Sequence, residues 1–591
     1  MASSPLFQSP DTATPPAPTR AQVGGDATHA DLIQVDTALE SMRDSGYDLT
    51  AAVGEPVDNS LEANARIIRV EPTYGANNQS VDAIAVADDG AGIDPDNMAH
   101  VLSMGYSTRY GQRSGLGRFG VGMKLAGLSL GRRIDVYSTR RIDDRIWHAY
   151  IDLDEIKNGT QKHIIAESVE DWPSTYARLM ADAQGNPFSS GTLVIYGNID
   201  RLTSGGHYAT ALDEKISELR TFIARTYRYY LDKGRTIELA GTPVTLLDPL
   251  FLLDNPRIIK QYKPLDVRGT IIEQADIEIR PGQRIHVTVS LAPEEFRPKS
   301  GSGGTHDYKG RPIRDYHIAE SAGKISMVRN GREINYDIVA KLLPAGVDKI
   351  DRYIGIEVQF PAELDEFFQV RNVKRGAVPV MKLREELRKW LDRPVRHARS
   401  QIRRHWSDVE TRERAEAQAH ESVTAAVARV EQTSPPGQAG KDVSPEQEQQ
   451  YIRDVLDDLQ LDSGGDDVDT AARVQQEIEE KPITMVDAAW SGSELFEIVH
   501  LNGKAIVKIN HRHPFWKKVY GPIKAAASGT TNSTDEELLG LLRNAEAGID
   551  ALILAYAKAE NLHTDAAQFD DLRTYWGTFA RSYINEVIKE D

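Results

Sequence analysis

Hydrophobic residues recur at helical spacing near the start of the chain and then cluster in short alternating runs. Leu32, Val35 and Leu39 fall on one face of a predicted helix, and a second helix is predicted over residues 49–63. Strands are predicted at 65–70, 81–87, 133–138, 146–153 and 192–196. This mixture of helices and mostly antiparallel strands predicts a two-layer α/β domain over residues 31–235.

Similar patterns predict two further folded segments. Strands are expected at 271–279, 285–291, 325–328 and 354–360. With Asn330-Gly331 as a hairpin turn, they indicate a second α/β domain over residues 236–380. A hairpin turning at Asn502-Gly503, followed by two helices, predicts a small α+β domain over residues 475–591.

The segments between these domains differ in composition. Residues 1–30 are rich in Pro, Ser, Thr, Ala and Gly, which predicts a disordered tail. Residues 381–430 are expected to form one or two long helices, and positions 382–404 hold nine Lys or Arg against three Asp or Glu. Residues 431–474 are expected to be a flexible acidic linker, because 441–470 hold ten acidic and two basic residues, although residues 452–461 could form one helical turn or more.

Overall composition narrows the class of protein. The 591 residues carry a formal net charge of −18, which argues against uniform coating of nucleic acid or of an anionic membrane. Cysteine is absent, which excludes thiolate zinc sites, iron–sulfur clusters and Cys nucleophiles and fits a cytoplasmic location. No apolar run reaches membrane-spanning length, and the N-terminus has no secretory-signal pattern, so no membrane association is expected.

Glu55 and Asn59 stand four positions apart in the second predicted helix. Residues at this spacing share a helix face. A carboxylate and a carboxamide placed together can provide a general base and a metal ligand. Taken alone, the pair is more typical of a solvated helix face.

Asp88, Gly90 and Gly92 follow the predicted strand 81–87 directly. A buried carboxylate at Asp88 can accept a hydrogen bond from an exocyclic amine. The two glycines allow a flat ligand to approach the backbone closely. Alone, this pattern is more typical of an ordinary turn at the end of a strand.

A glycine-rich stretch over residues 115–124 opens another predicted helix, and backbone N–H groups at a helix start can hold phosphate. No strand precedes its G-x-G-x-x-G, so the Rossmann pattern is excluded. No H-R-D or D-F-G follows, which excludes a protein kinase, and no P-loop sequence occurs in the chain.

In this order and spacing, the motifs resemble the signature of the GHKL superfamily of ATPases: E-x-x-x-N, D-x-G-x-G and G-x-x-G-x-G. Gly191-Thr192 matches the fourth element of that signature. The sequences EPVDNSLEANA and GRFGVGMKLA look most like the MutL and MORC branches. The resemblance implies a Bergerat nucleotide fold over residues 31–235, and a weaker similarity implies a transducer-like domain to about residue 380.

By this resemblance the protein is an ATPase that uses Mg²⁺, and several side chains acquire roles. Glu55 would orient and deprotonate water, Asn59 would bind Mg²⁺, and Asp88 would read the adenine amino group. The base pocket would be lined by Gly90 and Gly92, with Thr192 at the adenine end.

The resemblance also assigns the phosphate contacts. The phosphates would be wrapped by Gly117, Gly120, Val121 and Gly122, under a lid formed by residues 105–114. Lys374 is the candidate for the γ-phosphate, although a surface lysine fits that position equally well. Lys124 is the second candidate.

Pro56 departs from the family pattern, because proline inside a helix removes a hydrogen bond and clashes with the preceding turn. The helix is therefore expected to start or kink there. His420-Glu421 lies after the ATPase segment and lacks a following proline, which argues against a sensor histidine kinase. His500, His511 and His513 are expected to be ordinary surface or hairpin histidines rather than metal ligands.

The resemblance implies an ATP-gated homodimeric clamp, with DNA as the expected substrate in a repair or phage-defence setting and with operon-encoded protein partners. Arg396, Arg399, Arg403 and Arg404 are the DNA-binding candidates. Alternatively, this basic helix pairs with the acidic linker. Two other functions stay open: a chaperone-like ATPase acting on a protein client, and a nucleotide-sensing scaffold with little hydrolysis.

Overall fold

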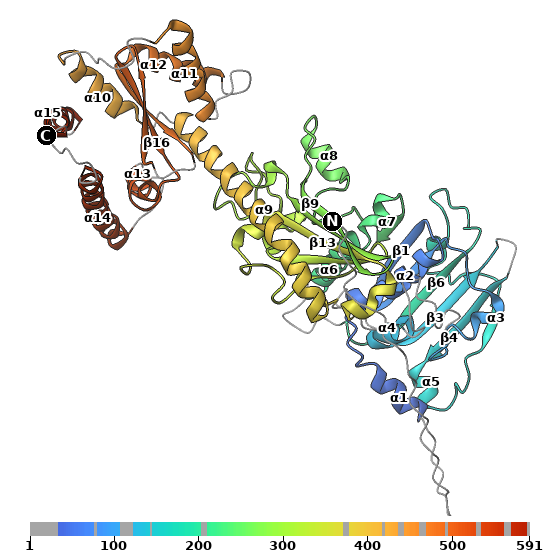
Figure 1. The fold of residues 1–591 in the computed structure, drawn as a ribbon. Helices are drawn as coiled ribbons and strands as arrows, with labels where there is room; N and C mark the ends of the chain where they lie inside the picture. The colour runs from blue at the N-terminus through green and yellow to red at the C-terminus, as the bar shows by residue number, and fades with distance from the viewer. Residues whose placement is uncertain are drawn as a thin grey trace, which may run out of the picture. The chain divides into compact units, whose positions relative to one another are not determined.

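The computed structural model divides the chain into two compact units (Figure 1). The N-terminal unit comprises Met1–Arg297 and Ser302–Arg399, and the C-terminal unit comprises Pro298–Gly301 and Ser400–Asp591. The structure describes residues 34–75, 80–106, 122–141, 145–202, 210–369, 377–416, 420–434, 443–459, 468–490, 494–527, 534–560 and 569–587. The predicted tail over residues 1–30 lies outside this part of the chain.

An eight-stranded mixed sheet forms the first half of the N-terminal unit, in the order β5-β4-β3-β6-β2-β1-β7-β8. Its strands are β1 (Ile67–Tyr74), β2 (Val81–Asp88), β3 (Gly131–Thr139), β4 (Ile146–Asp152), β5 (Ala166–Val169), β6 (Gly191–Ile199), β7 (Thr236–Leu239) and β8 (Thr242–Pro243). Neighbouring strands are antiparallel except β1 and β7. The sheet therefore continues past the domain boundary expected at residue 235.

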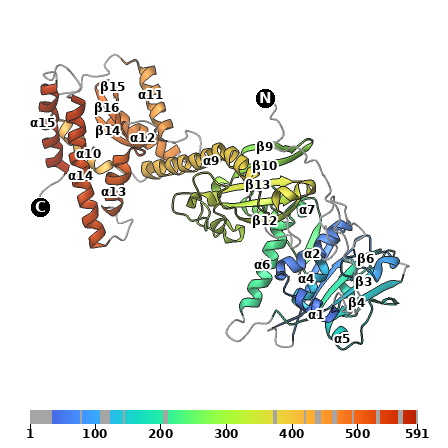
Figure 2. The same cartoon turned by 60° about the horizontal axis from the view of Figure 1, so that its bottom comes forward.

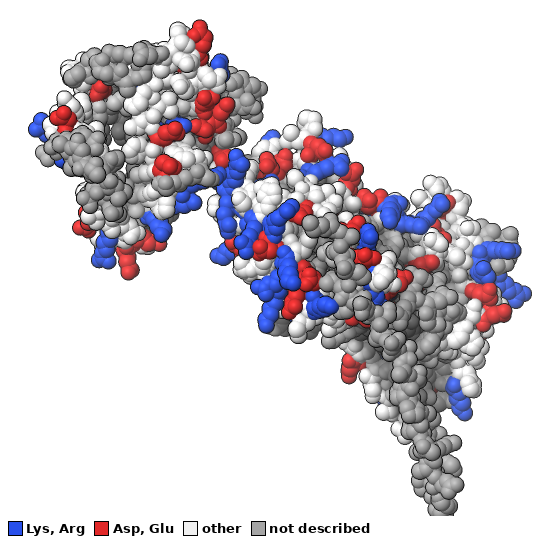
Figure 3. Space-filling model, in the orientation of Figure 1, with Lys and Arg blue, Asp and Glu red and all other residues white. Residues whose placement is uncertain are grey.

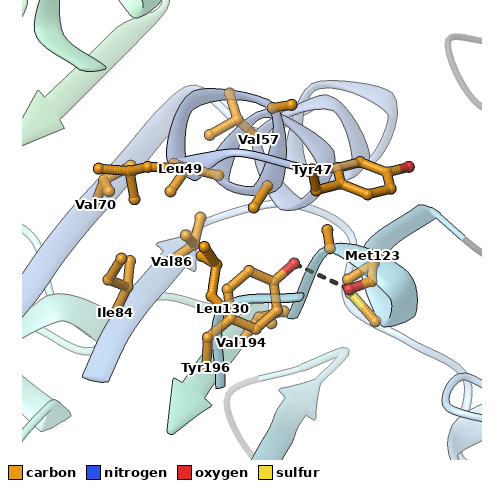
Figure 4. Close-up of a cluster of buried hydrophobic side chains, with 14 of the residues drawn as sticks. Tyr47, Leu49, Val57, Val70, Ile84, Val86, Met123, Leu130, Val194 and Tyr196 are labelled. Atoms are coloured by element: carbon orange, nitrogen blue, oxygen red, sulfur yellow. Dashed lines mark hydrogen bonds between the residues drawn. The ribbon is translucent and has the colours of Figure 1, made fainter. Parts of the chain in front are cut away.

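Helices cover one face of this sheet (Figure 2). They are α1 (Val35–Met42), α2 (Leu49–Glu62), α4 (Gly122–Leu130), α6 (Thr210–Thr226) and α7 (Arg228–Asp232), with the short α3 (Pro95–Met98) and α5 (Leu153–Lys157) nearby in sequence. Alternation along β2 separates the two faces. Ile84 and Val86 belong to the core beneath α2 (Figure 4), whereas Ala85 and Ala87 pack with a segment that includes the 3-10 turn Ala177–Met180.

Helix α2 begins at Leu49, as the helix predicted over residues 49–63 does, and it continues through Pro56, so the alternative that the helix starts at the proline is wrong. The reason is a start signal upstream of the proline. The Asp48 side chain accepts a hydrogen bond from the Ala51 N–H at 3.0 Å and caps the first turn. Burial of almost the whole helix then holds it in place despite the missing N–H of Pro56.

The second half of the N-terminal unit contains a five-stranded sheet in the order β12-β11-β13-β10-β9. Its strands are β9 (Thr270–Arg280), β10 (Gln283–Leu291), β11 (Lys324–Arg329), β12 (Arg332–Ile338) and β13 (Ile354–Phe360), and α8 (Pro256–Tyr262) precedes them. The predicted hairpin turn is confirmed: Asn330 and Gly331 both have positive φ, 49° and 80°.

A buried ion-pair cluster joins the two halves of this unit. Arg228, with none of its side chain exposed, donates to Glu333 at 3.0 Å, contacts Glu357, and lies 3.5 Å from Asp248. Arg225 pairs with the other oxygen of Glu333 at 2.6 Å. Removing one member of such a buried cluster leaves an uncompensated charge, which costs about 3–5 kcal/mol.

The C-terminal unit is built on a three-stranded sheet in the order β14-β16-β15. Its strands are β14 (Ile483–Ala488), β15 (Phe496–Leu501) and β16 (Lys504–Asn510), and its helices are α10 (Glu421–Glu431), α11 (Pro445–Asp458), α12 (Val468–Glu480), α13 (Gly521–Ala527), α14 (Asp535–Glu560) and α15 (Asp570–Val587). Helix α9 (Met381–Glu416) crosses the boundary between the units. The hairpin turn at Asn502-Gly503 is confirmed by positive φ at both residues.

The expected acidic linker over residues 431–474 differs from the structure, which shows much of it as α11 and α12. Ile452, Val455, Leu456 and Leu459 are buried against α12 and the sheet. These residues are spaced for one helix face. The acidic residues occupy the solvated side of a packed amphipathic helix. Within the described ranges, no helix is long and apolar enough to cross a membrane.

Candidate nucleotide site

Helix α2 presents Glu55 and Asn59 on one face, as their spacing predicts. Glu55 is 6% exposed and Asn59 is exposed. The Tyr47 hydroxyl donates to Glu55 Oε1 over a long 3.5 Å. The carboxylate is therefore shielded from bulk water, and the amide one turn later is open to a ligand.

Gly122, the first residue of α4, lies directly against this carboxylate. A Cβ added at Gly122 would be 2.1 Å from Glu55 Oε2. Real atoms do not approach this closely, so any larger residue displaces Glu55 or the start of α4. Gly122, the last glycine of G-x-x-G-x-G, thus lies next to Glu55, the first residue of E-x-x-x-N.

We expect Gly122→Ala to lower ATP turnover at least tenfold, because the methyl group moves the Glu55 carboxylate out of line. Gly197→Ala in β6 is the matched control, since its nearest neighbour would be 3.8 Å away. Steady-state hydrolysis by both variants checks this. Equal rates for the two variants would show that the Glu55–Gly122 contact has no catalytic importance.

Asp88 ends β2 in a closed polar environment. It is 5% exposed, and it accepts hydrogen bonds from Ser60 Oγ and from the Gly90 N–H, both at 2.8 Å. Burial raises the pKa of Asp88 to about 6, against the lowering effect of these bonds. The carboxyl group therefore changes charge near neutral pH. Ser60 directly follows Asn59 in the first motif, and its role was missed in the sequence.

Thr192 pairs with Asp88 across β6 and β2. Its hydroxyl lies 3.0 Å from Ser138 Oγ, and Ser138 also accepts from the Ile93 N–H at 2.9 Å. Gly92 has φ of 69°, and a Cβ there would be 2.2 Å from the Thr139 carbonyl oxygen, so only glycine fits. The D-x-G-x-G motif at the end of β2 and Gly191-Thr192 at the start of β6 therefore lie side by side. Ser138 carries no motif and was not predicted.

Lys124 is 3% exposed, and its ammonium group donates to the carbonyl oxygens of Ser103 at 2.5 Å and Tyr106 at 3.3 Å. Burial lowers the pKa of Lys124 to about 8. This position favours anchoring the backbone at residues 103–106 over contact with a phosphate.

Several predicted site residues lie outside the described residues. They are Gly117, Gly120 and Val121, most of the expected lid over residues 105–114, and Lys374. Their assignments stay predictions.

The four DNA-binding candidates on α9 have different surroundings. Arg399 is 9% exposed and forms two 2.7 Å hydrogen bonds to Asp351, so it is held inside the N-terminal unit and is removed from the candidates. Arg396 pairs with Asp392 on the same helix at 2.9 Å. Figure 3 shows Lys and Arg side chains gathered along α9.

Arg403 and Arg404 line a pocket of about 910 Å³ within the C-terminal unit. The other cations that line it are Lys299, Arg512 and Lys517, and the lining includes Trp406 and Trp516 but no Asp or Glu. This pocket is a positively charged concavity on an acidic protein. The sequence signal was visible only for the two arginines on α9.

His420 and His511 are buried, so His511, which directly follows the hairpin strand β16, is not a surface histidine. Asp487 lies 2.8 Å from His420 Nε2 and 3.2 Å from His511 Nε2. Burial alone would raise the pKa of Asp487, but these contacts hold it well below its usual range. Within the described ranges, no three or more His, Asp or Glu residues form a group that could hold a metal ion.

Comparisons with known proteins identify the domain. Residues 47–185 match the family described as "Histidine kinase-, DNA gyrase B-, and HSP90-like ATPase". Protein MICRORCHIDIA 2 of Arabidopsis thaliana is 26% identical over 299 residues, covering 39% of this chain and 46% of that protein. Protein MICRORCHIDIA 3 of the same plant is also 26% identical over 299 residues, covering 38% and 50%.

ATPase MORC2A of Mus musculus is 26% identical over 183 residues, covering 27% of this chain and 18% of that protein. The chain thus spans about half, or less, of the curated relatives it matches. A solved structure titled as the N-terminal domain of a DNA repair protein aligns with 62% of this chain and 98% of that one, at 15% identity and a TM-score of 0.34. Residues 47–185 therefore carry a GHKL-type ATPase domain, and the chain that contains it is similar to MORC proteins.

Proposed function

We propose that the protein binds and hydrolyses ATP with Mg²⁺, and that ATP closes a homodimer into a clamp on DNA. The observation that carries the ATPase part is the contact between Glu55 and Gly122, because the carboxylate lies against the start of α4, and backbone N–H groups at a helix start can hold phosphate. The repair or phage-defence setting is part of the same proposal.

In this proposal, α2 carries the residue that activates water, and β2 and β6 carry the residues that bind the adenine end. Glu55 accepts a proton from water as the water oxygen forms a bond to the γ-phosphorus. The bond from that phosphorus to the bridging oxygen breaks, and ADP leaves with its electron pair. Asp88 and Thr192, on the paired strands β2 and β6, fix the adenine end.

The donors present fit Mg²⁺. Asn59 offers an exposed amide oxygen beside Glu55, and oxygen ligands are what Mg²⁺ prefers. Mg²⁺ is commonly held by one or two side chains together with substrate phosphates. Asn59 and the phosphates of ATP would therefore hold the ion together. The ion would neutralise part of the negative charge on those phosphates.

The basic pocket of the C-terminal unit supports DNA as the substrate. It concentrates Arg403, Arg404, Arg512 and Lys517 without a lining carboxylate, although the chain carries a net charge of −18. Cations that replace counterions on phosphates give binding that weakens steeply with salt.

We expect the double variant Arg403→Ala/Arg404→Ala to bind duplex DNA more weakly and to flatten the plot of log affinity against log salt by about 0.9 for each lost contact. The double variant Arg393→Ala/Arg396→Ala, whose side chains contact Glu273 and Asp392, removes the same charge and should change the slope less. Fluorescence anisotropy at several salt concentrations measures both. If wild type binds no DNA at low salt with an ATP analogue, the protein-client function replaces this one.

A further inference from the structure

The hairpin between β11 and β12 reaches from the second sheet of the N-terminal unit to helix α2. Arg332, the first residue of β12, is 4% exposed and donates from Nε to Asp58 Oδ1 at 3.0 Å. A Cβ added at Gly54 would lie 3.3 Å from Arg332 Nη2. The guanidinium group therefore packs directly on the helix that carries Glu55.

The contact has a buried second partner. The Tyr227 hydroxyl lies 2.9 Å from Asp58 Oδ1 and 3.0 Å from the Gly54 carbonyl oxygen. Asp58 is 1% exposed and Tyr227 is fully buried. Arg332 and Tyr227 thus hold α2 at Gly54 and at Asp58, on both sides of Glu55 in sequence.

The next residue of the hairpin is fixed in another direction. Glu333 is 3% exposed and pairs with Arg225 at 2.6 Å and with Arg228 at 3.0 Å. The start of β12 is therefore attached both to α2, through Arg332, and to the α6–α7 region, through Glu333. A displacement of the hairpin would therefore disturb both contacts.

Charge reinforces the contact at α2. Burial acts to lower the pKa of Arg332, but Asp58, Tyr227 and Glu55 together raise it above its ordinary value. The guanidinium stays positive, and Glu55 is one of the groups that its charge stabilises.

We propose that Arg332 is a positioning residue for ATP hydrolysis, which acts through Asp58 to hold Glu55 in its productive place. Turnover then depends on where the second sheet places its hairpin, and the β11–β12 turn transmits the state of that sheet to the catalytic helix. This inference rests on the proposed ATPase function.

The test is Arg332→Met in the full chain, measured by steady-state hydrolysis and by equilibrium binding of an ATP analogue. We expect kcat to fall roughly tenfold or more, because small displacements of a catalytic group are costly, while the analogue Kd stays within about twofold. Arg332→Lys, which keeps the charge, should recover part of the loss.

The matched control is Arg329→Met, at the end of β11 in the same hairpin. Arg329 is 5% exposed and forms a two-pronged pair with Asp365, at 2.6 and 3.0 Å. Both methionine variants break a buried ion pair and should lower the melting temperature similarly. Only Arg332→Met should lower kcat beyond what that loss of stability explains, and equal kcat losses in the two variants would overturn the proposal.

Asp58→Asn tests the same link, because it removes the carboxylate charge that pairs with Arg332 while it keeps the shape of the side chain. In combination with Arg332→Met it should lower kcat no further than the worse single variant. Additive losses, or an unchanged kcat in either single variant, would show that Arg332 does not act through Asp58. If the wild-type chain does not hydrolyse ATP, the proposed ATPase function fails instead, and if Glu55→Gln leaves hydrolysis intact, only the assignment of Glu55 as the base fails.

Discussion

Glu55→Gln should lower ATP turnover by roughly 10²–10⁴-fold while the affinity for ATP changes little, because a general base contributes about that much to rate. Glutamine has the same shape as glutamate, so the close contact with Gly122 is kept and only the basic oxygen is lost. In the proposed site, the adenine and phosphate contacts are assigned to other residues. Phosphate release and equilibrium binding of ATP measure the two quantities.

The same variant tests the clamp. If ATP closes two N-terminal units together, Glu55→Gln should accumulate in the closed state with ATP and sediment as a heavier species than it does without nucleotide. The same sedimentation with and without nucleotide would contradict the ATP-gated clamp. Turnover close to wild type would remove Glu55 as the base.

The affinity for ATP should fall up to about tenfold between pH 7.5 and pH 5, because protonation of Asp88 replaces an anionic acceptor for the adenine amine. Burial raises the pKa of Asp88 to about 6, so the group is mostly ionised at pH 7.5 and mostly protonated at pH 5. Nucleotide favours the ionised form, and the loss follows as pH falls through about 6. Calorimetric titration across this range measures it.

Asp88→Asn is the control for this titration, because its amide does not ionise. It should bind ATP about 10–100-fold more weakly at pH 7.5, since a charged hydrogen bond contributes about 1.5–3 kcal/mol. The affinity of the variant should also vary less with pH than that of wild type. Parallel pH profiles for the two proteins would remove Asp88 from the adenine role.

Asp88 also affects stability without nucleotide, in the opposite sense to a salt-bridged carboxylate. Its pKa is about 6 in the folded chain and near the ordinary 3.8 in the unfolded chain. The folded state therefore holds the proton longer, and the contribution of Asp88 to stability is lost as pH rises from about 4 through 6. Nucleotide should restore part of it.

Local patterns in the sequence were sufficient to name several candidate residues that the structure brings close together. Glu55 and Asn59 are one helical turn apart, and Asp88 is followed at once by its glycines, so each motif is readable within ten residues. The Asn330-Gly331 turn was predicted for the same reason. Ser138 and Arg332 were missed, because their importance comes from partners on other elements. Arg332 and Asp58 are separated by 274 positions.

Composition misled the interpretation of the segment after α10. Ten acidic residues among thirty gave residues 441–470 the average of a solvated linker. The helical spacing of Ile452, Val455, Leu456 and Leu459 was present but was outweighed by that average. Burial is decided residue by residue on one helix face, so the mean charge of a segment does not determine whether it folds.

The buried cluster around Arg228 bears on how the protein can be divided for expression and exchanged in evolution. A cut near residue 235 would separate Arg228 from Glu333 and Glu357, and a cut at residue 185, where the family match ends, would remove β6 from between β3 and β2 in the first sheet. The smallest piece that we expect to fold stably is residues 34–399. This piece also contains the short Pro298–Gly301 segment, which belongs to the other unit. A nucleotide-binding half taken from a relative would need to be transferred together with its second sheet. We therefore expect the two halves of the N-terminal unit to be inherited together.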